Sequence, residues 1–311
     1  MKVAEVPGER IHRELPASMT QLIKPIIIVG TGRCGSTIFH RLLARHPQVM
    51  WLSVFSDRYP SNPAVNRWVV TALGNPLFHR LFGGKIQPGE CYRFWDAHAY
   101  GFSTPCRDLL KEDVTPRMKK QVRLAMESLL TSSRNRMLLK IAGWSRIGFL
   151  KEIFEDAKFI HIVRDGRAVA SSVLHVDFWR GWRGPQGWGA GMLSPEDQAA
   201  WDGTNRSFVA LAGIQWQLRT RAMEAARQKI DSKDFFEVKY ETFCDQPLET
   251  YRQVLEFAEL PQSAVFEQHI KEASIKSTSN RWRDDLTAGQ QGVLDNLLRE
   301  DLLRYGYDVT R

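Results

Sequence analysis

The chain alternates short apolar runs with longer segments in which apolar residues recur every three or four positions. The short runs are rich in branched residues and are typical of buried strands, whereas the longer segments are typical of helices. The predicted strands are 25–30, 49–55, 136–141, 158–163 and 234–240. The predicted helices are 36–47, 118–130, 145–154, 166–175, 205–229, 247–260 and 289–304.

Strands that alternate with helices predict an α/β fold, with a parallel sheet covered by helices on both faces. Residues 1–24 are polar and aperiodic, and we expect a flexible arm there, followed by one domain over 25–311. Two further segments, 58–116 and 178–191, are rich in glycine, proline and aromatic residues, and the second is predicted to be a loop. The sequence contains no internal repeat.

The composition favours a protein with a full hydrophobic core and an anionic ligand. Of the 311 residues 43% are hydrophobic, and the formal net charge is +8. A positive charge attracts anions, although a merely basic surface would have the same composition. The four cysteines lack CxxC spacing, no apolar run approaches the ~20 residues of a membrane span, and the N-terminus is too charged for a secretion signal. We therefore expect a soluble, cytoplasmic protein without a membrane partner.

A glycine-rich segment at 30–37, Gly-Thr-Gly-Arg-Cys-Gly-Ser-Thr, joins the first predicted strand to the first predicted helix. Backbone N–H groups of such a turn, together with the helix N-terminus, suit a phosphate group. The glycine spacing fits a dinucleotide-binding turn, for which Asp57 would be the ribose-binding acid. It also fits the GxxxxG part of a Walker A loop, but Ser36 stands where that loop requires lysine. A tight turn that binds no ligand is the third alternative.

With Arg33 inside it, the segment resembles the 5′-phosphosulfate loop of sulfotransferases that use 3′-phosphoadenosine 5′-phosphosulfate (PAPS). In that family's pattern, [K/R]-x-G-[ST]-[ST], a cation within the loop and two hydroxyls bind the 5′ group. The resemblance assigns these roles to Arg33, Ser36 and Thr37. Gly35 then occupies the glycine position, and Cys34 occupies the variable position as a packing residue.

A second motif distinguishes between these alternatives. Arg164 follows the predicted strand 158–163, and Ser172 lies eight residues later on the predicted helix 166–175. This pair resembles the 3′-phosphate signature of the same family, in which a guanidinium and a hydroxyl converge on one phosphate. Neither a dinucleotide-binding enzyme nor a kinase needs the pair. The two motifs together imply a sulfotransferase with a P-loop-like fold.

Two further matches extend the resemblance over about residues 25–285. Tyr240 ends the last predicted strand, where the family has a tyrosine that lines the adenine site. Lys276 and Arg281 lie in a basic segment before a tryptophan, which resembles the loop that folds over the 3′-phosphate. A solvated basic loop is the alternative for this segment.

The reaction that the resemblance implies releases adenosine 3′,5′-bisphosphate (PAP) from PAPS. Sulfuryl transfer is formally similar to phosphoryl transfer, and negative charge develops on the bridging oxygen as it departs. A cation aimed at that oxygen stabilises the transition state. The candidates are Arg33 and Lys140. Lys140 lies near the end of the predicted strand 136–141, where the family usually carries a catalytic lysine. We expect no metal ion to be required.

The sequence leaves the general base open. Ala142 stands where many cytosolic relatives have histidine, and valine stands close to where others have glutamate. Asp57 and His98 are the first candidates, because Asp57 follows the predicted strand 49–55 at the carboxyl edge of the sheet and a histidine titrates near neutrality. The remaining candidates are Glu90 and Asp96. An amine acceptor would not need a strong base.

We expect a small-molecule acceptor in a pocket built from 51–110 and 178–191. Four aromatic residues among glycines in the second segment suggest a mobile lid, or else an ordered loop that completes the core: Phe178, Trp179, Trp182 and Trp188. A P-loop small-molecule kinase is the alternative enzyme. A nucleic-acid-binding protein is the other alternative, but the lysines and arginines are scattered rather than gathered in one stripe.

Overall fold

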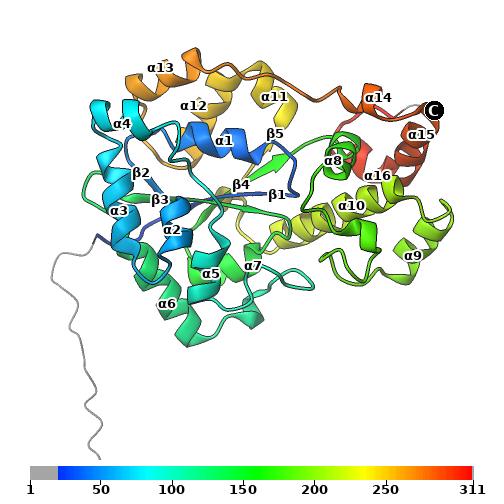
Figure 1. Cartoon of the computed structure of the whole chain (residues 1–311), viewed down its shortest axis with the longest axis horizontal. Helices are drawn as coiled ribbons and strands as arrows, with labels where there is room; N and C mark the ends of the chain where they lie inside the picture. The colour runs from blue at the N-terminus through cyan, green and yellow to red at the C-terminus, as the bar shows by residue number, and fades with distance from the viewer. Residues whose placement is uncertain (1–19, 310–311) are drawn as a thin grey trace, which may run out of the picture.

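The computed structural model describes residues 20–309, and Figure 1 shows its architecture. One parallel sheet forms the centre, with the strand order β2-β3-β1-β4-β5. The strands are β1 (Ile26–Gly30), β2 (Val49–Trp51), β3 (Arg136–Ala142), β4 (Lys158–Val163) and β5 (Phe235–Lys239). All five predicted strands are present, and the predicted parallel α/β fold is confirmed.

Helices account for most of the remaining described residues. The α-helices are α1 (Ser36–Leu43), α2 (Val54–Arg58), α3 (Pro63–Ala72), α4 (Pro76–Phe82), α5 (Tyr92–His98), α6 (Pro116–Glu127), α7 (Ile147–Ile153), α8 (Gly166–Leu174), α9 (Pro195–Asp202), α10 (Phe208–Arg227), α11 (Tyr240–Asp245), α12 (Pro247–Phe257), α13 (Ala264–Glu272), α14 (Trp282–Asp285), α15 (Ala288–Leu297) and α16 (Arg299–Arg304). Three short 3₁₀ helices are η1 (Lys111–Asp113), η2 (Gly181–Arg183) and η3 (Ser232–Asp234).

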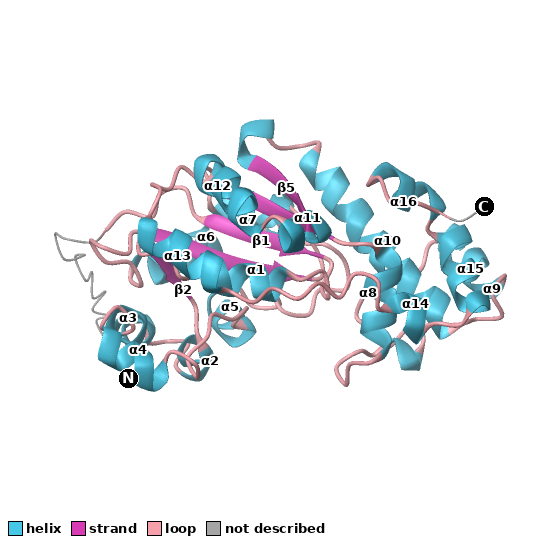
Figure 2. Ribbon diagram, turned by 90° about the horizontal axis from the view of Figure 1, so that it is seen from above, coloured by secondary structure: helices cyan, strands magenta, loops and turns pink. Residues whose placement is uncertain are grey.

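Helices cover both faces of the sheet. Figure 1 shows α1, α11, α12 and α13 on one side of the strands and α5, α6 and α7 on the other. Figures 1 and 2 both place α8, α14, α15 and α16 beyond the carboxyl ends of the central strands. In open α/β sheets, ligands bind at the carboxyl ends of the strands. We therefore expect the ligand site between these strand ends and these helices.

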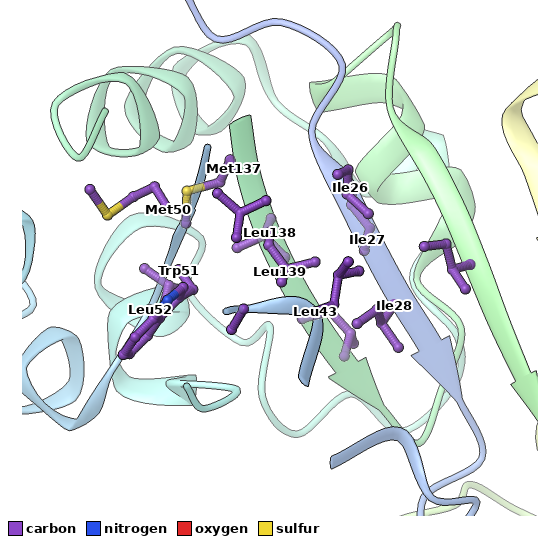
Figure 3. Packing of buried hydrophobic residues seen from close by; sticks show 14 of the residues in the cluster. Ile26, Ile27, Ile28, Leu43, Met50, Trp51, Leu52, Met137, Leu138 and Leu139 are labelled. Atoms are coloured by element: carbon purple, nitrogen blue, oxygen red, sulfur yellow. The ribbon is translucent and has the colours of Figure 1, made fainter. Parts of the chain in front are cut away.

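The strands are largely apolar in sequence because the core buries both faces of the sheet. Ile26, Ile27, Ile28 and Val29 of β1 are all fully buried, because both faces of a parallel sheet are covered. Figure 3 shows the β1 isoleucines beside Leu138 and Leu139 of β3, with which Ile26 and Ile27 pair in register. A second buried cluster, between α8, α10 and the C-terminal helices, contains Trp216 and Trp282 and holds α8 against the sheet edge.

The segment predicted as a strand over 49–55 is shorter in the structure. β2 ends at Trp51, and α2 begins three residues later at Val54, where the N-cap Ser53 Oγ accepts a hydrogen bond from the backbone N–H of Phe55 at 3.2 Å. Asn66 Nδ2 donates to the carbonyl oxygen of Trp51 at 2.9 Å, which replaces a strand partner for that group. Asp57 therefore lies on a helix rather than at the end of a strand.

The N-terminal boundary also differs from the prediction. Most of the expected arm, residues 1–19, lies outside the described residues, but 20–24 belong to the packed fold. Leu22 is buried in the core, and the backbone N–H of Lys24 donates to Asp156 Oδ2 at 2.7 Å. The folded part therefore begins before Pro25, because an apolar side chain in an otherwise polar segment reaches the core.

Candidate active site

The loop between β1 and α1 is built from residues in the left-handed region. Gly32, Arg33 and Gly35 have φ angles of +83°, +55° and +87°. Glycine is required at position 35 for a second reason, since a Cβ there would overlap the ring of Tyr240. α1 begins without a side-chain cap and without an acidic residue in its first turn. Its N-terminus is therefore suited to an anion.

The structure brings the two predicted phosphate motifs together. Arg33 Nε donates a hydrogen bond to Ser172 Oγ at 3.0 Å, and Arg164 Nη1 donates to the carbonyl oxygen of Arg33 at 2.9 Å. Arg164 Nη2 also donates to the carbonyl and hydroxyl oxygens of Thr278, at 2.7 and 3.0 Å. The guanidinium carbon of Arg164 lies 4.6 Å from the centre of the Tyr240 ring. Tyr240 thus contacts both the loop and Arg164.

A cavity of about 420 Å³, the α8 cavity, opens beside this pair. Its lining residues come from the loop, the end of β4, α8 and the residue after it, the segment before α14, and α14 itself: Arg33, Arg164, Ala168, Ser171, Ser172, His175, Thr278, Arg281, Trp282 and Asp285. Arg164 is buried, and its Nε has no hydrogen-bond partner among the described residues. An unpaired buried donor is costly, so a bound anion would compensate for it. Lys276 is exposed and does not line this cavity.

A larger cavity of about 540 Å³, the main cavity, lies at the carboxyl ends of β1 and β3. It shares Arg33 with the α8 cavity and includes Ser36 and Thr37 of the loop. Lys140 Nζ donates to Thr37 Oγ1 at 3.0 Å and forms an ion pair with Glu90 Oε1 at 2.6 Å. The buried lysine therefore connects the phosphate loop to a carboxylate inside the main cavity.

The two acids or bases that the sequence analysis placed first lie outside both cavities. Asp57 Oδ1 accepts hydrogen bonds from the backbone N–H groups of Arg93 and Phe94, at 3.0 and 3.4 Å, at the start of α5. The Nε2 atom of His98 lies 3.1 Å from the carbonyl oxygen of Pro60, and burial lowers the pKa of His98. Both side chains are engaged in local structure.

Of the two remaining candidates, only Glu90 lies in the main cavity. Asp96 Oδ1 accepts from the backbone N–H of Ser103 at 3.0 Å and does not line it. Glu90 lies in an extended segment between α4 and α5, where no motif marked it. Its position depends on the path of that segment across the sheet edge, which the sequence does not reveal.

Arg219 is a cavity residue that the sequence analysis missed. It lies on α10, and its Nη1 donates to the carbonyl oxygen of Thr31 in the loop at 2.8 Å. Burial lowers the pKa of Arg219 to about 10, and its Nε has no hydrogen-bond partner among the described residues. No carboxylate of the described residues forms an ion pair with it. One signal was present: α10 has no charged residue before Arg219 from its first residue at 208.

Tyr92 forms another wall of the main cavity. Its hydroxyl donates to the carbonyl oxygen of Ala142, at the end of β3, at 3.0 Å. Burial and the nearby carboxylate of Glu90 raise the pKa of Tyr92. The phenol therefore stays protonated, and it fixes α5 against the strand that carries Lys140.

Both segments expected to form the acceptor pocket reach the main cavity, but only part of the predicted lid is exposed. Trp179 and Trp188 are buried, and their indole N–H groups donate to Gln215 Oε1 and to the Gly191 carbonyl oxygen, both at 2.7 Å. Phe178 is 63% exposed and lines the cavity. Trp182 is 51% exposed and does not line it. The loop is thus anchored by two tryptophans.

The described residues contain neither a cluster of metal ligands nor a helix able to span a membrane. Between 20 and 309, no three His, Cys, Asp or Glu side chains gather closely enough to hold a metal ion. Within the same residues, no helix combines the length and apolar character that crossing a bilayer requires.

The fold and this site define a group-transferring enzyme of the P-loop type, without the lysine of a Walker A loop. The model of the sulfotransferase family matches residues 25–264, so the chain belongs to the sulfotransferase family. This result confirms the resemblance stated above, and the protein is a sulfotransferase rather than a kinase or a nucleic-acid-binding protein.

Individual relatives agree with the family assignment. The chain is 26% identical to the omega-hydroxy-beta-dihydromenaquinone-9 sulfotransferase Stf3 of Mycobacterium bovis, over 91% of this chain and 75% of Stf3. The crystal structure of sulfotransferase STF9 from Mycobacterium avium superposes with a TM-score of 0.57 at 18% identity, covering 93% of this chain and 78% of STF9. The sulfotransferase domain of the curacin biosynthetic pathway gives 0.53 at 12% identity, covering 93% and 100%. The two structural likenesses support the fold.

Proposed function

We propose that the protein transfers the sulfuryl group of PAPS to a hydroxyl group of a small apolar acceptor and releases PAP. The observation that carries this proposal is the sharing of Arg33 between two adjacent cavities. A nucleotide with phosphates at both its 3′ and 5′ ends needs two anion sites of this kind. The α8 cavity would hold the 3′-phosphate, and the loop would hold the 5′-phosphosulfate.

Four side chains would bind the 3′-phosphate. Arg164 and Ser172 face the α8 cavity together with Arg33, and Arg281 lines its outer part. Tyr240 lines neither cavity, and its buried ring packs between Gly35 and Arg164, so it would contact the adenine only at the edge of the site. We keep Lys276 only as an outer contact, because it is exposed and lies outside the lining of the α8 cavity.

At the 5′ end, the loop would bind the phosphosulfate through the backbone and through the hydroxyls of Ser36 and Thr37. Cys34 is buried, and its sulfur lies against Gly30, which supports a packing role. Lys140, at 3.0 Å from Thr37 Oγ1, is placed to donate to the oxygen that bridges sulfur and the 5′-phosphate. That oxygen gains negative charge as the bond breaks, so the lysine stabilises the transition state more than the ground state.

We propose Glu90 as the general base. Its carboxylate lies in the main cavity, next to Lys140, where an acceptor hydroxyl would approach the sulfur. The acceptor oxygen forms the new bond to sulfur, its proton moves to Glu90, and PAP leaves with the electron pair of the broken bond. The mechanism requires no metal ion.

Arg219 would act as a second cation near the sulfuryl group. It is held by the carbonyl oxygen of Thr31 and lines the main cavity beside Gly32. A buried guanidinium without a carboxylate partner is costly, and an anionic group on the donor would offset that cost.

The acceptor side of the main cavity has several aromatic walls. Trp144, Phe178 and Trp188 line it, together with Pro105 and Val173. Such walls favour an acceptor with an apolar body that carries one hydroxyl. The name of Stf3 describes an acceptor of that kind, an omega-hydroxy menaquinone derivative. The proposed acceptor class is therefore a hydroxylated apolar molecule.

The test compares the binding of PAP and AMP by calorimetry, because AMP lacks only the 3′-phosphate. Hydrogen bonds to charged groups contribute about 1.5–3 kcal/mol each, so we expect PAP to bind at least about tenfold more tightly. Ser172→Ala should weaken PAP binding and leave AMP binding unchanged. Equal affinities of the wild-type protein for PAP and AMP would contradict the proposal.

We also propose a cytoplasmic location. The four cysteines (Cys34, Cys91, Cys106 and Cys244) are all free thiols, and two of them are buried. This supports a reducing compartment. Labelling of the thiols in intact cells, followed by fractionation, tests this location.

A further inference from the structure

The helix α4 has an unusual distribution of apolar residues. None of its seven residues is buried, although its sequence, Pro-Leu-Phe-His-Arg-Leu-Phe, is mostly apolar. Leu77 and Leu81 are 73% and 68% exposed, and Phe82 is 41% exposed. In a water-soluble surface helix such residues normally face the core. This helix presents them to the outside.

The exposed side chains continue onto α3, and they form one patch around Phe78, which is half-buried against the core. The ring centres of Trp68 and Phe78 lie 6.1 Å apart, and those of Phe78 and Phe82 lie 4.7 Å apart. Leu77 and Leu81 are four residues apart and so share one side of α4. We call this set the α4 patch: Trp68, Leu77, Phe78, Leu81 and Phe82. Contiguous apolar surface of this kind marks an interaction site.

The charges on the chain segment that carries the patch all have one sign. Residues 58–89 contain no aspartate or glutamate, but they contain Arg58, Arg67, Arg80 and Lys85. All four cations are exposed, and none of them forms an ion pair within the described part of the chain. The patch is therefore complementary to an anionic partner.

A third cavity, of about 440 Å³, opens beside α4 and is also basic. Its cationic and imidazole lining comes from α1, α4, α13 and the segment before β3: Arg41, Arg45, His79, Arg134 and His269. The lining includes no aspartate or glutamate. The Nδ1 atom of His269 is buried without a hydrogen-bond partner among the described residues. An anionic group in this cavity would have several donors, while the nearest acid recorded, Glu272, acts on His269 from outside the lining.

We propose that the α4 patch and this basic cavity bind the surface of a lipid bilayer that contains anionic lipids. α4 is much too short to cross a bilayer, but an apolar face with tryptophan and flanking cations suits the boundary between headgroups and acyl chains. A lipid phosphate would occupy the basic cavity. Figures 1 and 2 both place α3 and α4 at the end of the molecule opposite α15 and α16, where a flat surface has access to them.

This inference goes beyond the proposed function and does not depend on it. It also revises the expectation that the protein has no membrane partner, which rested on the lack of an apolar run long enough to span. Surface binding needs only a short apolar face and positive charge, so the lack of a membrane-spanning segment does not argue against it.

The experiment is co-sedimentation of the full chain with vesicles of phosphatidylcholine alone and of phosphatidylcholine with about one third phosphatidylglycerol. We expect at least about tenfold stronger partitioning onto the anionic vesicles. Arg80→Gln should reduce it about fivefold, the equivalent of about 1 kcal/mol per cation near the surface. Leu81→Gln should reduce it by about tenfold.

Matched control variants lie on other elements. Leu303→Gln changes a leucine of α16 that is 56% exposed, and Lys229→Gln changes an exposed cation after α10. Both should bind vesicles as the wild type does. Arg45→Gln tests the basic cavity and should weaken binding to anionic vesicles alone. None of these residues lines the main cavity or the α8 cavity, so activity toward a soluble acceptor should be unchanged.

Three outcomes would overturn the proposal. The first is no binding to either kind of vesicle. The second is equal loss of binding in the patch variants and their controls. The third is thermal stabilisation of the protein by soluble glycerol phosphate, lost in Arg45→Gln, without vesicle binding, which would assign the cavity to a free anion.

Discussion

A single lysine connects the donor and acceptor parts of the site. The register of β3 against β1 pairs Lys140 with Ile28, two residues before the carboxyl end of each strand. Its neighbours in β3, Leu139 and Ile141, are buried in the core, so the strand cannot shift without moving them. A buried ammonium that contacts both Thr37 and Glu90 is thus held by the packing of the sheet.

We predict that Lys140→Ala lowers kcat by about 10²–10³, by analogy with the loss of one donor to a developing oxyanion. PAP affinity, measured by calorimetry, should change much less, because the bridging oxygen gains its charge only in the transition state. A loss of PAP affinity as large as the loss in kcat would instead assign the lysine to ground-state binding.

We predict that Glu90→Gln lowers kcat/KM by about 10²–10⁴, since general acid–base catalysis contributes that range. The amide keeps the shape of the carboxylate but cannot accept the proton. Asp96→Asn is the matched control, because Asp96 lies in the same region of the chain and faces the backbone of Ser103. Steady-state kinetics with one acceptor should show a near wild-type rate for the control. Similar rates for both variants would exclude Glu90 as the base.

The short helices show how elements support the site without touching it. α5 begins at Tyr92 after Cys91, whose φ is +54° and whose side chain does not cap the helix. The carboxylate of Asp57, on α2, accepts hydrogen bonds from the first backbone N–H groups of α5 instead. Asp57 therefore positions the helix that carries Tyr92 into the main cavity.

We predict that Asp57→Ala lowers the free energy of unfolding by about 1 kcal/mol, the usual cost of losing a cap. Asp57→Asn should be milder, because the amide oxygen still accepts these hydrogen bonds. Urea unfolding measures both, and kcat/KM should stay near the wild-type value for Asp57→Asn. A severe kinetic loss in Asp57→Asn would return this residue to the list of candidate bases.

The elements that the sequence predicted well are those with strong local signals. β1 is an unbroken apolar run and β4 is mostly apolar. The phosphate motifs directly follow these two strands in the sequence, so their place in the fold could be predicted from the strands. The short helices in 58–116 were missed, although Asn75-Pro76 matches the pattern of an N-cap followed by proline at the first helical position. Their helical periods are too few to be recognised.

The rest of the site depends on contacts across long stretches of sequence. Glu90 and Lys140 are fifty residues apart, and Arg219 reaches the loop from a helix nearly two hundred residues later. No short sequence motif predicts either contact. The sequence favoured Asp57 as base because it follows a predicted strand end, and that end proved to be the helix α2.

At the scale of the whole molecule, the fold lowers the pKa of several histidines, of which His40 and His46 are buried and His98 and His269 are half-buried. Burial lowers the pKa of His40, His46, His98 and His269, and for His40 the nearby cation of Lys140 adds to the effect. In the unfolded chain these imidazoles take up protons near pH 6.5. In the folded protein they do so only at lower pH, so protonation favours unfolding below that value.

We therefore predict that the free energy of unfolding is highest above pH 6.5 and decreases between about pH 6.5 and 5. Each histidine that stays neutral contributes up to about 1.4 kcal/mol per pH unit over this window. Urea unfolding at several pH values measures the slope, and His40→Gln should reduce it by the share of one histidine. A slope that is unchanged in His40→Gln would show that His40 is not the source.

The meeting of two cavities at Arg33 has an evolutionary consequence. The donor side depends on a loop and a helix that follow β1 and β4, whereas much of the acceptor wall comes from segments around 103–105 and 178–189. Substitutions in those two segments can change the shape of the acceptor wall without altering Arg33, Arg164 or Ser172. New acceptors can thus be acquired while the nucleotide stays the same, and the scaffold can diversify one half of its reaction at a time.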